Sequence, residues 1–185
     1  MYAREMIRQS LPLIILCGFG GIIAGSTLSA MIDLFYSIPG LIVVIPAIIA
    51  LRGNISTALG SRLGSAYHLG VIDADNLWND DLKQNIIGSL VLSFLISIII
   101  GFFAYITTIL FFNLHPDPVK LISIVILAGI FSAIILTFLT VIIIYFVFKR
   151  GFDPDNITGP ALATFGDIIT MFCIFFSAIF IEVIA

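Results

Sequence analysis

The chain has 185 residues, of which 61% are apolar and only 10% are charged. Soluble domains usually carry about 25% charged residues, so this chain lacks the polar groups needed to cover a water-facing surface. The composition therefore excludes an ordinary soluble protein, and the net charge of −3 without a basic cluster gives no indication of a nucleic-acid partner. We expect an all-α membrane protein with a single domain, residues 1–185, in the lipid bilayer.

Five apolar segments are long enough to cross a membrane, since a spanning helix needs about 20 residues. In chain order the predicted helices are residues 11–33, 36–68, 84–114, 118–149 and 158–184. Segments rich in Pro, Gly and Asp separate them at 37–40, 115–118 and 149–155. The one long polar stretch, 52–85, is interpreted as an extension of the second helix, then a loop, then a lead-in at Trp78 that suits the membrane interface.

The distribution of Lys and Arg predicts the orientation, because cytoplasmic segments carry an excess of positive charge. With the N-terminus inside and the C-terminus outside, only Lys120 lies outside. Seven basic residues then lie inside: Arg4, Arg8, Arg52, Arg62, Lys83, Lys149 and Arg150. Five spans cannot divide into two equal halves, so a symmetric pore needs a second copy. We therefore expect a multi-pass protein of the cell (plasma) membrane, which would be a two-fold homodimer if it forms such a pore.

Asp167 is a charged residue inside the fifth apolar segment. It follows Ile157 by ten residues, or roughly 15 Å along a helix axis, which places it within the hydrocarbon layer. An Asp there costs about 2.5 to 3.5 kcal/mol on insertion scales and marks a polar cavity, a partner or an ion by default. The alternative is a structural aspartate, protonated and hydrogen-bonded to a neighbouring helix. Helical spacing puts several residues on its side: Pro160, Ala163, Thr164, Thr170 and Met171.

The second helix continues into a polar segment rich in small residues. Gly53, Gly60 and Gly64 recur at roughly helical spacing. Such residues allow close approach of another helix, and they also expose backbone carbonyls that can bind hard cations. The sequence leaves both interpretations open. Asn54 lies in the same segment, and an amide near membrane depth needs a polar partner.

Oxygen atoms dominate the polar groups that could bind a metal. His68 and His115 are isolated, and Cys17 and Cys173 lie in apolar runs, where they are interpreted as small buried residues. Carboxylate, amide and carbonyl oxygens suit Mg²⁺, with Ca²⁺ or Mn²⁺ also possible. One carboxylate per chain makes a sparse site, but two copies would supply a pair. Such a pair would suit Mg²⁺, which usually keeps several waters and binds through only one or two carboxylates.

Two stretches of this sequence resemble the membrane domain of MgtE-type magnesium transporters and the related solute-carrier magnesium transporters of animals. The first runs from Pro46 to Gly70 and reads PAIIALRGNISTALGSRLGSAYHLG. The second runs from Asp153 to Asp167 and reads DPDNITGPALATFGD. The resemblance implies a homodimer with five helices per subunit, the N-terminus inside, and a pore lined by the second and fifth helices.

The resemblance also implies a metal site. In this family a hydrated Mg²⁺ lies between paired aspartates of the fifth helix, and Asp167 matches that position. Ala163 matches a residue whose backbone carbonyl faces the ion, and Asp153 matches an acidic residue near the cytoplasmic mouth. Asn54 matches the first Asn of the Gly-Asn motif in the second helix. Further candidates for lining the pore are Gly53, Gly159, Thr164 and Thr170.

The sequence departs from the bacterial members of the family in two respects. They carry Asn-x-Gly-Asn in the second helix, whereas this chain reads Asn54-Ile55-Ser56-Thr57, which favours the stand-alone archaeal or animal-like branch. The bacterial proteins also carry large cytoplasmic Mg²⁺-sensing domains before the membrane part. Only about ten residues precede the first helix here, so we expect no cytoplasmic sensor domain.

Other functions are compatible with parts of this pattern. A single titratable group could serve an exchanger that couples a divalent cation to Na⁺ or H⁺. An intramembrane aspartyl protease needs two carboxylates that share a proton, and no second Asp lies within an apolar span. A small assembly protein without transport activity is the remaining alternative. We expect a cation transporter rather than an enzyme.

Overall fold

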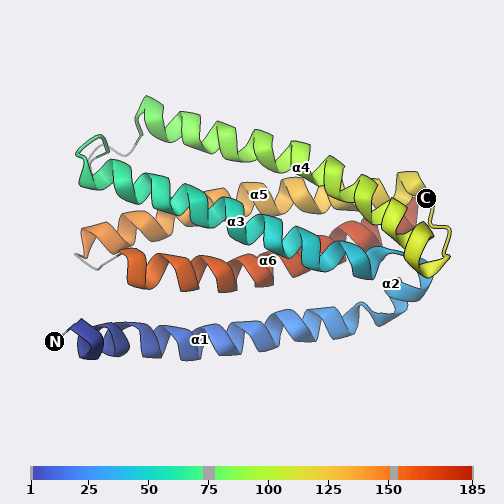
Figure 1. The fold of residues 1–185 in the computed structure, drawn as a ribbon, viewed down its shortest axis with the longest axis horizontal. Helices are drawn as coiled ribbons and strands as arrows, with labels where there is room; N and C mark the ends of the chain where they lie inside the picture. Colours follow the sequence, from blue (N-terminus) through green and yellow to red (C-terminus); the bar gives the residue numbers. More distant parts are fainter. Residues whose placement is uncertain (1, 73–77, 151–153, 185) are drawn as a thin grey trace.

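The computed structural model describes residues 2–72, 78–150 and 154–184. These residues form only helices and their connections, so the predicted all-α architecture is confirmed. Figure 1 shows an elongated bundle in which α3, α4, α5 and α6 lie together and α1 runs along one side. The helices are α1 (Tyr2–Ala30), α2 (Ile32–Ser37), α3 (Leu41–His68), α4 (Asp80–Phe112), α5 (Pro118–Lys149) and α6 (Pro154–Ile184).

Four helices are long and apolar enough to cross a membrane: α3, α4, α5 and the part of α6 from Thr158 to Ile184. Within α1, a shorter apolar helix covers Ile14–Ala30. Large apolar side chains are exposed on the outside of the bundle, for example Phe111, Val119 and Phe176, as expected for a surface that faces lipid. A membrane protein is therefore confirmed, whereas the fifth span stays a prediction.

The second long helix begins at Leu41 rather than at residue 36, because the short helix α2 ends at Ser37. Gly40 then adopts a φ of +90° as the N-cap of α3. A Cβ at this position would contact Thr108 and lie 3.2 Å from Cδ2 of Leu121. Only glycine suits both this left-handed conformation and this close approach, so Gly40 fixes the turn between α2 and α3.

The last helix begins at Pro154 rather than at residue 158. A proline suits the first turn of a helix because its missing N–H would have no partner there. A start at residue 158 would put Pro160 in the first turn, whereas in the structure Pro154 has that position. Pro160 consequently lies inside α6. Its carbonyl oxygen receives two side-chain donors, the Oγ1 of Thr164 at 3.1 Å and the Sγ of Cys17 on α1 at 3.4 Å.

Small residues bring α4 and α5 close together. A Cβ on Gly129 of α5 would fall on the side chain of Ser97, and a Cβ on Gly101 of α4 would lie 3.3 Å from the Cα of Ile122. The hydroxyl of Ser97 donates to the carbonyl of Ser93 in its own helix. The contact therefore depends on close packing rather than on a hydrogen bond from Ser97 across to α5.

Helix α6 is held between α1, α3 and α5. Helix α1 runs parallel to α6, and a Cβ on Gly20 would contact the Cγ2 of Thr164 and lie 3.1 Å from Cδ1 of Ile168. Helix α3 runs antiparallel to α6, as Figure 1 shows. A Cβ on Gly60 would lie 3.2 Å from both Leu162 and Thr158. These contacts fix the register of the helices that carry the predicted site residues.

Candidate cation site

The register of α3 and α6 places two predicted site residues at about the same level. Gly60 packs against Thr158 and Leu162, and the two helices are antiparallel. Asn54 precedes Gly60 on α3 by six residues. Because the helices are antiparallel, Asn54 should lie level with the residues of α6 about six positions after Thr158 and Leu162, roughly residues 164 to 168. Asp167 falls within this interval. The fold therefore brings the amide of the second predicted span and the carboxylate of the last one to one depth.

On α6, the residues around Asp167 divide between an open and a covered surface. Ala163 is exposed, and Thr164 and Asp167 are half-buried. One turn further along, Thr170 is fully buried, and its Oγ1 has no hydrogen-bond partner among the described residues. Met171 is also buried. The predicted polar side of α6 thus runs from an open surface at Ala163 into the interior of the bundle at Thr170, and Thr170 does not belong to the open part.

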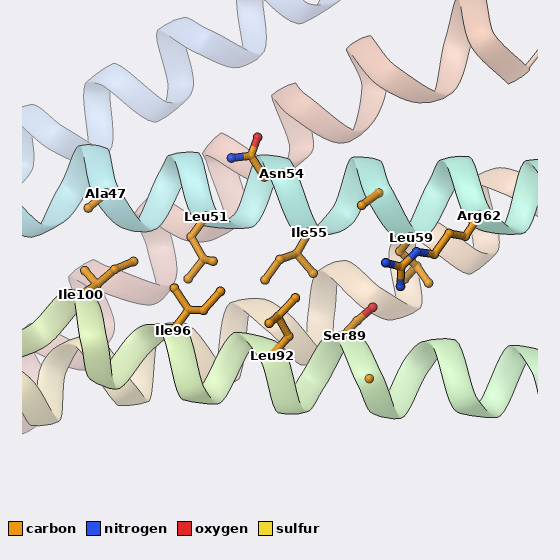
Figure 2. Close-up of a pocket in the computed structure, with 12 residues that line it drawn as sticks. Ala47, Leu51, Asn54, Ile55, Leu59, Arg62, Ser89, Leu92, Ile96 and Ile100 are labelled. Carbon is orange, nitrogen blue, oxygen red and sulfur yellow. The ribbon is translucent and has the colours of Figure 1, made fainter.

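On α3, Gly53 is half-buried and Asn54 is exposed. The Oγ1 of Thr57 donates to the carbonyl of Gly53 at 2.7 Å. A cavity of about 540 Å³ lies between α3 and α4, with Leu51 and Ile55 among its lining residues. Asn54 also lines this cavity, but Figure 2 shows its amide group pointing away from α4, whereas the side chains of Leu51 and Ile55 point toward α4. Asn54 is therefore available to a polar path on the side of α3 that faces away from α4.

Arg52 has an unusual environment for a charged residue. Its side chain is only 1% exposed, and Nε and Nη2 have no hydrogen-bond partner among the described residues. The side chain is enclosed within the bundle in the middle of α3, which was not expected of a basic residue at the end of a span. The assignment of Arg52 to the cytoplasmic side stays a prediction, as does the orientation of the whole chain.

A polar cavity of about 310 Å³ lies between α3 and the first turns of α6. The Oγ1 of Thr158 is buried there without a hydrogen-bond partner among the described residues. Gly159, one of the predicted pore residues, also lines this cavity. The other lining residues are small, hydroxyl-bearing or imidazole groups: Thr57, Gly60, Ser61, Gly64, Ser65 and His68. Open polar volume therefore lies on the side of Asn54 and Asp167 that is nearer the start of α6.

Asp153, predicted to lie near the mouth of the pore, falls outside the described residues. Within the described part of the chain, no three His, Cys, Asp or Glu side chains form a group that could hold a metal ion. Near the level of Asp167, one chain offers the carboxylate of Asp167, the amide of Asn54, and hydroxyl and carbonyl oxygens. A hard cation that keeps its water shell needs no more than one or two carboxylates.

Two features near Asp167 were not predicted from the sequence. The first is the burial of Arg52 between α3 and its neighbours. The second is the tight contact of Gly20 on α1 with Thr164 on α6, directly before the turn that carries Asp167. The sequence held a signal for the second feature, because α1 contains Gly18, Gly20, Gly21 and Gly25 within an apolar run, a composition typical of close helix contacts.

These features define a multi-pass helical membrane protein in which two neighbouring helices carry polar residues at about the same level. More particularly, the chain belongs to the MgtE family, described as divalent cation transporters, whose model matches residues 45–177. This assignment confirms the resemblance inferred from the two motifs.

The curated relatives are solute carriers of animals. The chain is 31% identical over 175 residues to solute carrier family 41 member 2 of Xenopus laevis, and also 31% identical to that of Homo sapiens. Each match covers 90% of this chain and 30% of the relative. Solute carrier family 41 member 3 of Rattus norvegicus is 24% identical over 166 residues, which cover 85% of this chain and 35% of the relative. The chain thus spans about a third of the length of these relatives. No solved structure matches.

Proposed function

We propose that this chain conducts a divalent cation across the plasma membrane, with Mg²⁺ as the main candidate, through a pore that two copies form together. The observation that carries the proposal is the position of Asp167. It is a half-buried carboxylate inside an apolar helix, nine residues after Thr158, where the apolar part of α6 begins. Membership of a divalent cation transporter family supports the proposal.

In this proposal, α3 and α6 line the pore with the surface that carries Asn54, Ala163 and Asp167. The two Asp167 carboxylates of a homodimer face each other across a two-fold axis and hold the cation through its water shell. Ala163 is exposed, so its carbonyl, the amide of Asn54 and the oxygens of Gly53 and Thr164 can accept hydrogen bonds from that water. Paired carboxylates favour a divalent ion because each contributes one negative charge.

The cavity at Gly159 then forms the cytoplasmic vestibule, with Asp153 close to the mouth. Its hydroxyl groups offer oxygen atoms without fixed charge, which suits the passage of a hydrated ion, since conduction requires sites weak enough to release it. Thr170 is left out of the lining because it is buried inside the chain. With the N-terminus inside, the cation leaves the Asp167 site toward this vestibule during uptake.

The test is transport of Mg²⁺ by the purified protein in liposomes loaded with a Mg²⁺-sensitive dye. Asp167→Asn keeps the size of the side chain and removes its charge, and we expect it to lower the flux at least tenfold. Asp33→Asn serves as a matched control, because Asp33 is an exposed carboxylate outside the apolar run. Cross-linking or light scattering shows whether both variants remain dimers. Wild-type flux through Asp167→Asn would refute the proposal.

A further inference from the structure

Arg52 is a second charged residue in the middle of the bundle, close to the proposed cation site but not part of it. Arg52 precedes Gly60 on α3 by eight residues, and Gly60 packs against Thr158 and Leu162 of the antiparallel helix α6. The residues of α6 eight positions after these two are Gly166 and Thr170. The backbone of Arg52 therefore lies about level with the turn of α6 that carries Asp167.

The two side chains extend in opposite directions from this level. Helical side chains lean toward the N-terminus of their own helix, and α3 and α6 are antiparallel. The guanidinium of Arg52 consequently leans toward the later residues of α6, where Cys173 lies within electrostatic reach, and the carboxylate of Asp167 leans toward the earlier ones. The ion pairs agree with this geometry. Among the described residues, Lys83 pairs with Asp80, and Arg52 forms no ion pair.

The charge of Arg52 is therefore not cancelled by a described neighbour. A buried charge with unpaired N–H groups is costly, and a membrane-spanning chain that carries one usually uses it. In a low-dielectric interior its field also extends further than that of a surface charge. Because the two side chains lean apart, a cation beside Asp167 would lie more than one helix diameter, about 10 Å, from the guanidinium, a distance at which this field still acts.

We propose that Arg52 acts on the cation site through its charge. It is a fixed positive charge behind the pore wall, and it weakens the binding of the cation at Asp167. This inference rests on the proposed function. Two facing carboxylates alone would hold a divalent cation tightly and release it slowly. Because conduction needs binding that is favourable but weak enough for exit, a positive charge at the same depth lowers the affinity without blocking the path, since Arg52 itself is buried.

Transport measurements can show in which direction the charge of Arg52 changes the cation affinity, and how this change depends on the charge of the ion. Removal of the charge in Arg52→Gln should lower the half-saturating Mg²⁺ concentration of the liposome flux, on the order of tenfold or more. The maximal flux should fall, because release becomes slower. The Coulomb energy is proportional to the charge of the ion. The logarithmic change for Na⁺, measured as a competitor of Mg²⁺ flux, should therefore be about half that for Mg²⁺.

Three further variants separate charge from structure. Arg52→Lys keeps the charge and should keep a half-saturating concentration close to that of the wild type. Cys173→Asp adds a negative charge within reach of the guanidinium, so it should neutralise Arg52 and shift the affinity in the same direction as Arg52→Gln, even if the latter folds poorly. Arg62→Gln removes an exposed positive charge of the same helix and should change the affinity far less.

The result that would overturn the inference is an unchanged or higher half-saturating Mg²⁺ concentration in both Arg52→Gln and Cys173→Asp, with the proteins folded and dimeric. An equal effect of Arg62→Gln would also overturn it, because it would indicate a general surface charge. Failure of the proposed function is distinguishable, since in that case Asp167→Asn transports like the wild type. If Asp167→Asn abolishes flux while the Arg52 variants behave like the wild type, only the role of Arg52 is refuted.

Discussion

The contact between Gly20 and α6 predicts a specific defect in Gly20→Ala. The new Cβ would collide with the Cγ2 of Thr164 and lie 3.1 Å from the Cδ1 of Ile168. The end of the Ile168 side chain can move, but Thr164 cannot rotate freely, because its hydroxyl donates to the carbonyl of Pro160 at 3.1 Å. Either α1 moves away from α6, or Thr164 loses a hydrogen bond worth about 1 kcal/mol.

The size of the effect follows from two opposing terms. Overpacking by one methyl group typically costs about 1 to 3 kcal/mol, whereas Ala in place of Gly stabilises a helix by up to about 1 kcal/mol. Gly18→Ala and Gly21→Ala on the same helix have nothing within 4 Å of the new Cβ, so they report the helix term alone. Relative to these controls, Gly20→Ala should lower the free energy of unfolding by about 1 to 3 kcal/mol.

The assay is unfolding by SDS titration in mixed micelles, followed by circular dichroism, with Mg²⁺ flux measured in parallel. Thr164→Ser removes Cγ2 and keeps the hydroxyl, so the double variant Gly20→Ala with Thr164→Ser should recover most of the lost stability and flux. A stability of Gly20→Ala equal to that of its controls, or the absence of any recovery with Thr164→Ser, would show that the collision is not the cause.

Two further predictions concern the ends of helices. Gly40→Ala should destabilise the protein by at least about 1 to 2 kcal/mol, because the φ of +90° is left-handed and the Cβ would contact Thr108; Gly88→Ala, which has open space, is the control in the same unfolding assay. Asp117→Ala should cost about 1 kcal/mol, since Asp117 caps α5 by accepting from the backbone N–H of Val119 at 2.8 Å and of Lys120 at 3.2 Å. Asp117→Asn, which can still accept, should retain most of the stability. A loss in Asp117→Asn equal to that in Asp117→Ala would contradict the capping role.

The sequence was sufficient to predict the class of fold, and it indicated Asp167 as the main candidate site residue. Apolar segments of membrane length predict helices because the bilayer leaves backbone groups no other partner. A lone Asp inside such a segment is conspicuous for the same reason. The helix boundaries were less predictable, since Pro154 and Pro160 both suit a helix start, and only the structure shows that the earlier one has that position.

The arrangement of the site depended on information that the sequence does not contain. The common level of Asn54 and Asp167 follows from the register of α3 and α6, which the contact at Gly60 sets. Arg52 follows an apolar run, so it resembled the usual basic residue at the end of a span, whereas its side chain is buried among the neighbouring helices. Thr170 shares a helical stripe with Asp167, but the neighbouring helices cover that part of the stripe. Burial of this kind is a property of the assembled bundle.

The placement of α1 has a consequence for the synthesis of the protein. Among the described helices, α1 packs mainly against α6, which lies at the other end of this sequence. Helices leave the ribosome in sequence order, so α1 is made before α3, α4 and α5, and its partner α6 is made after all three. Among these helices, α1 therefore acquires its main contact only at the end, and a chain that stops before α6 would leave Gly20 without its close packing against Thr164 and Ile168.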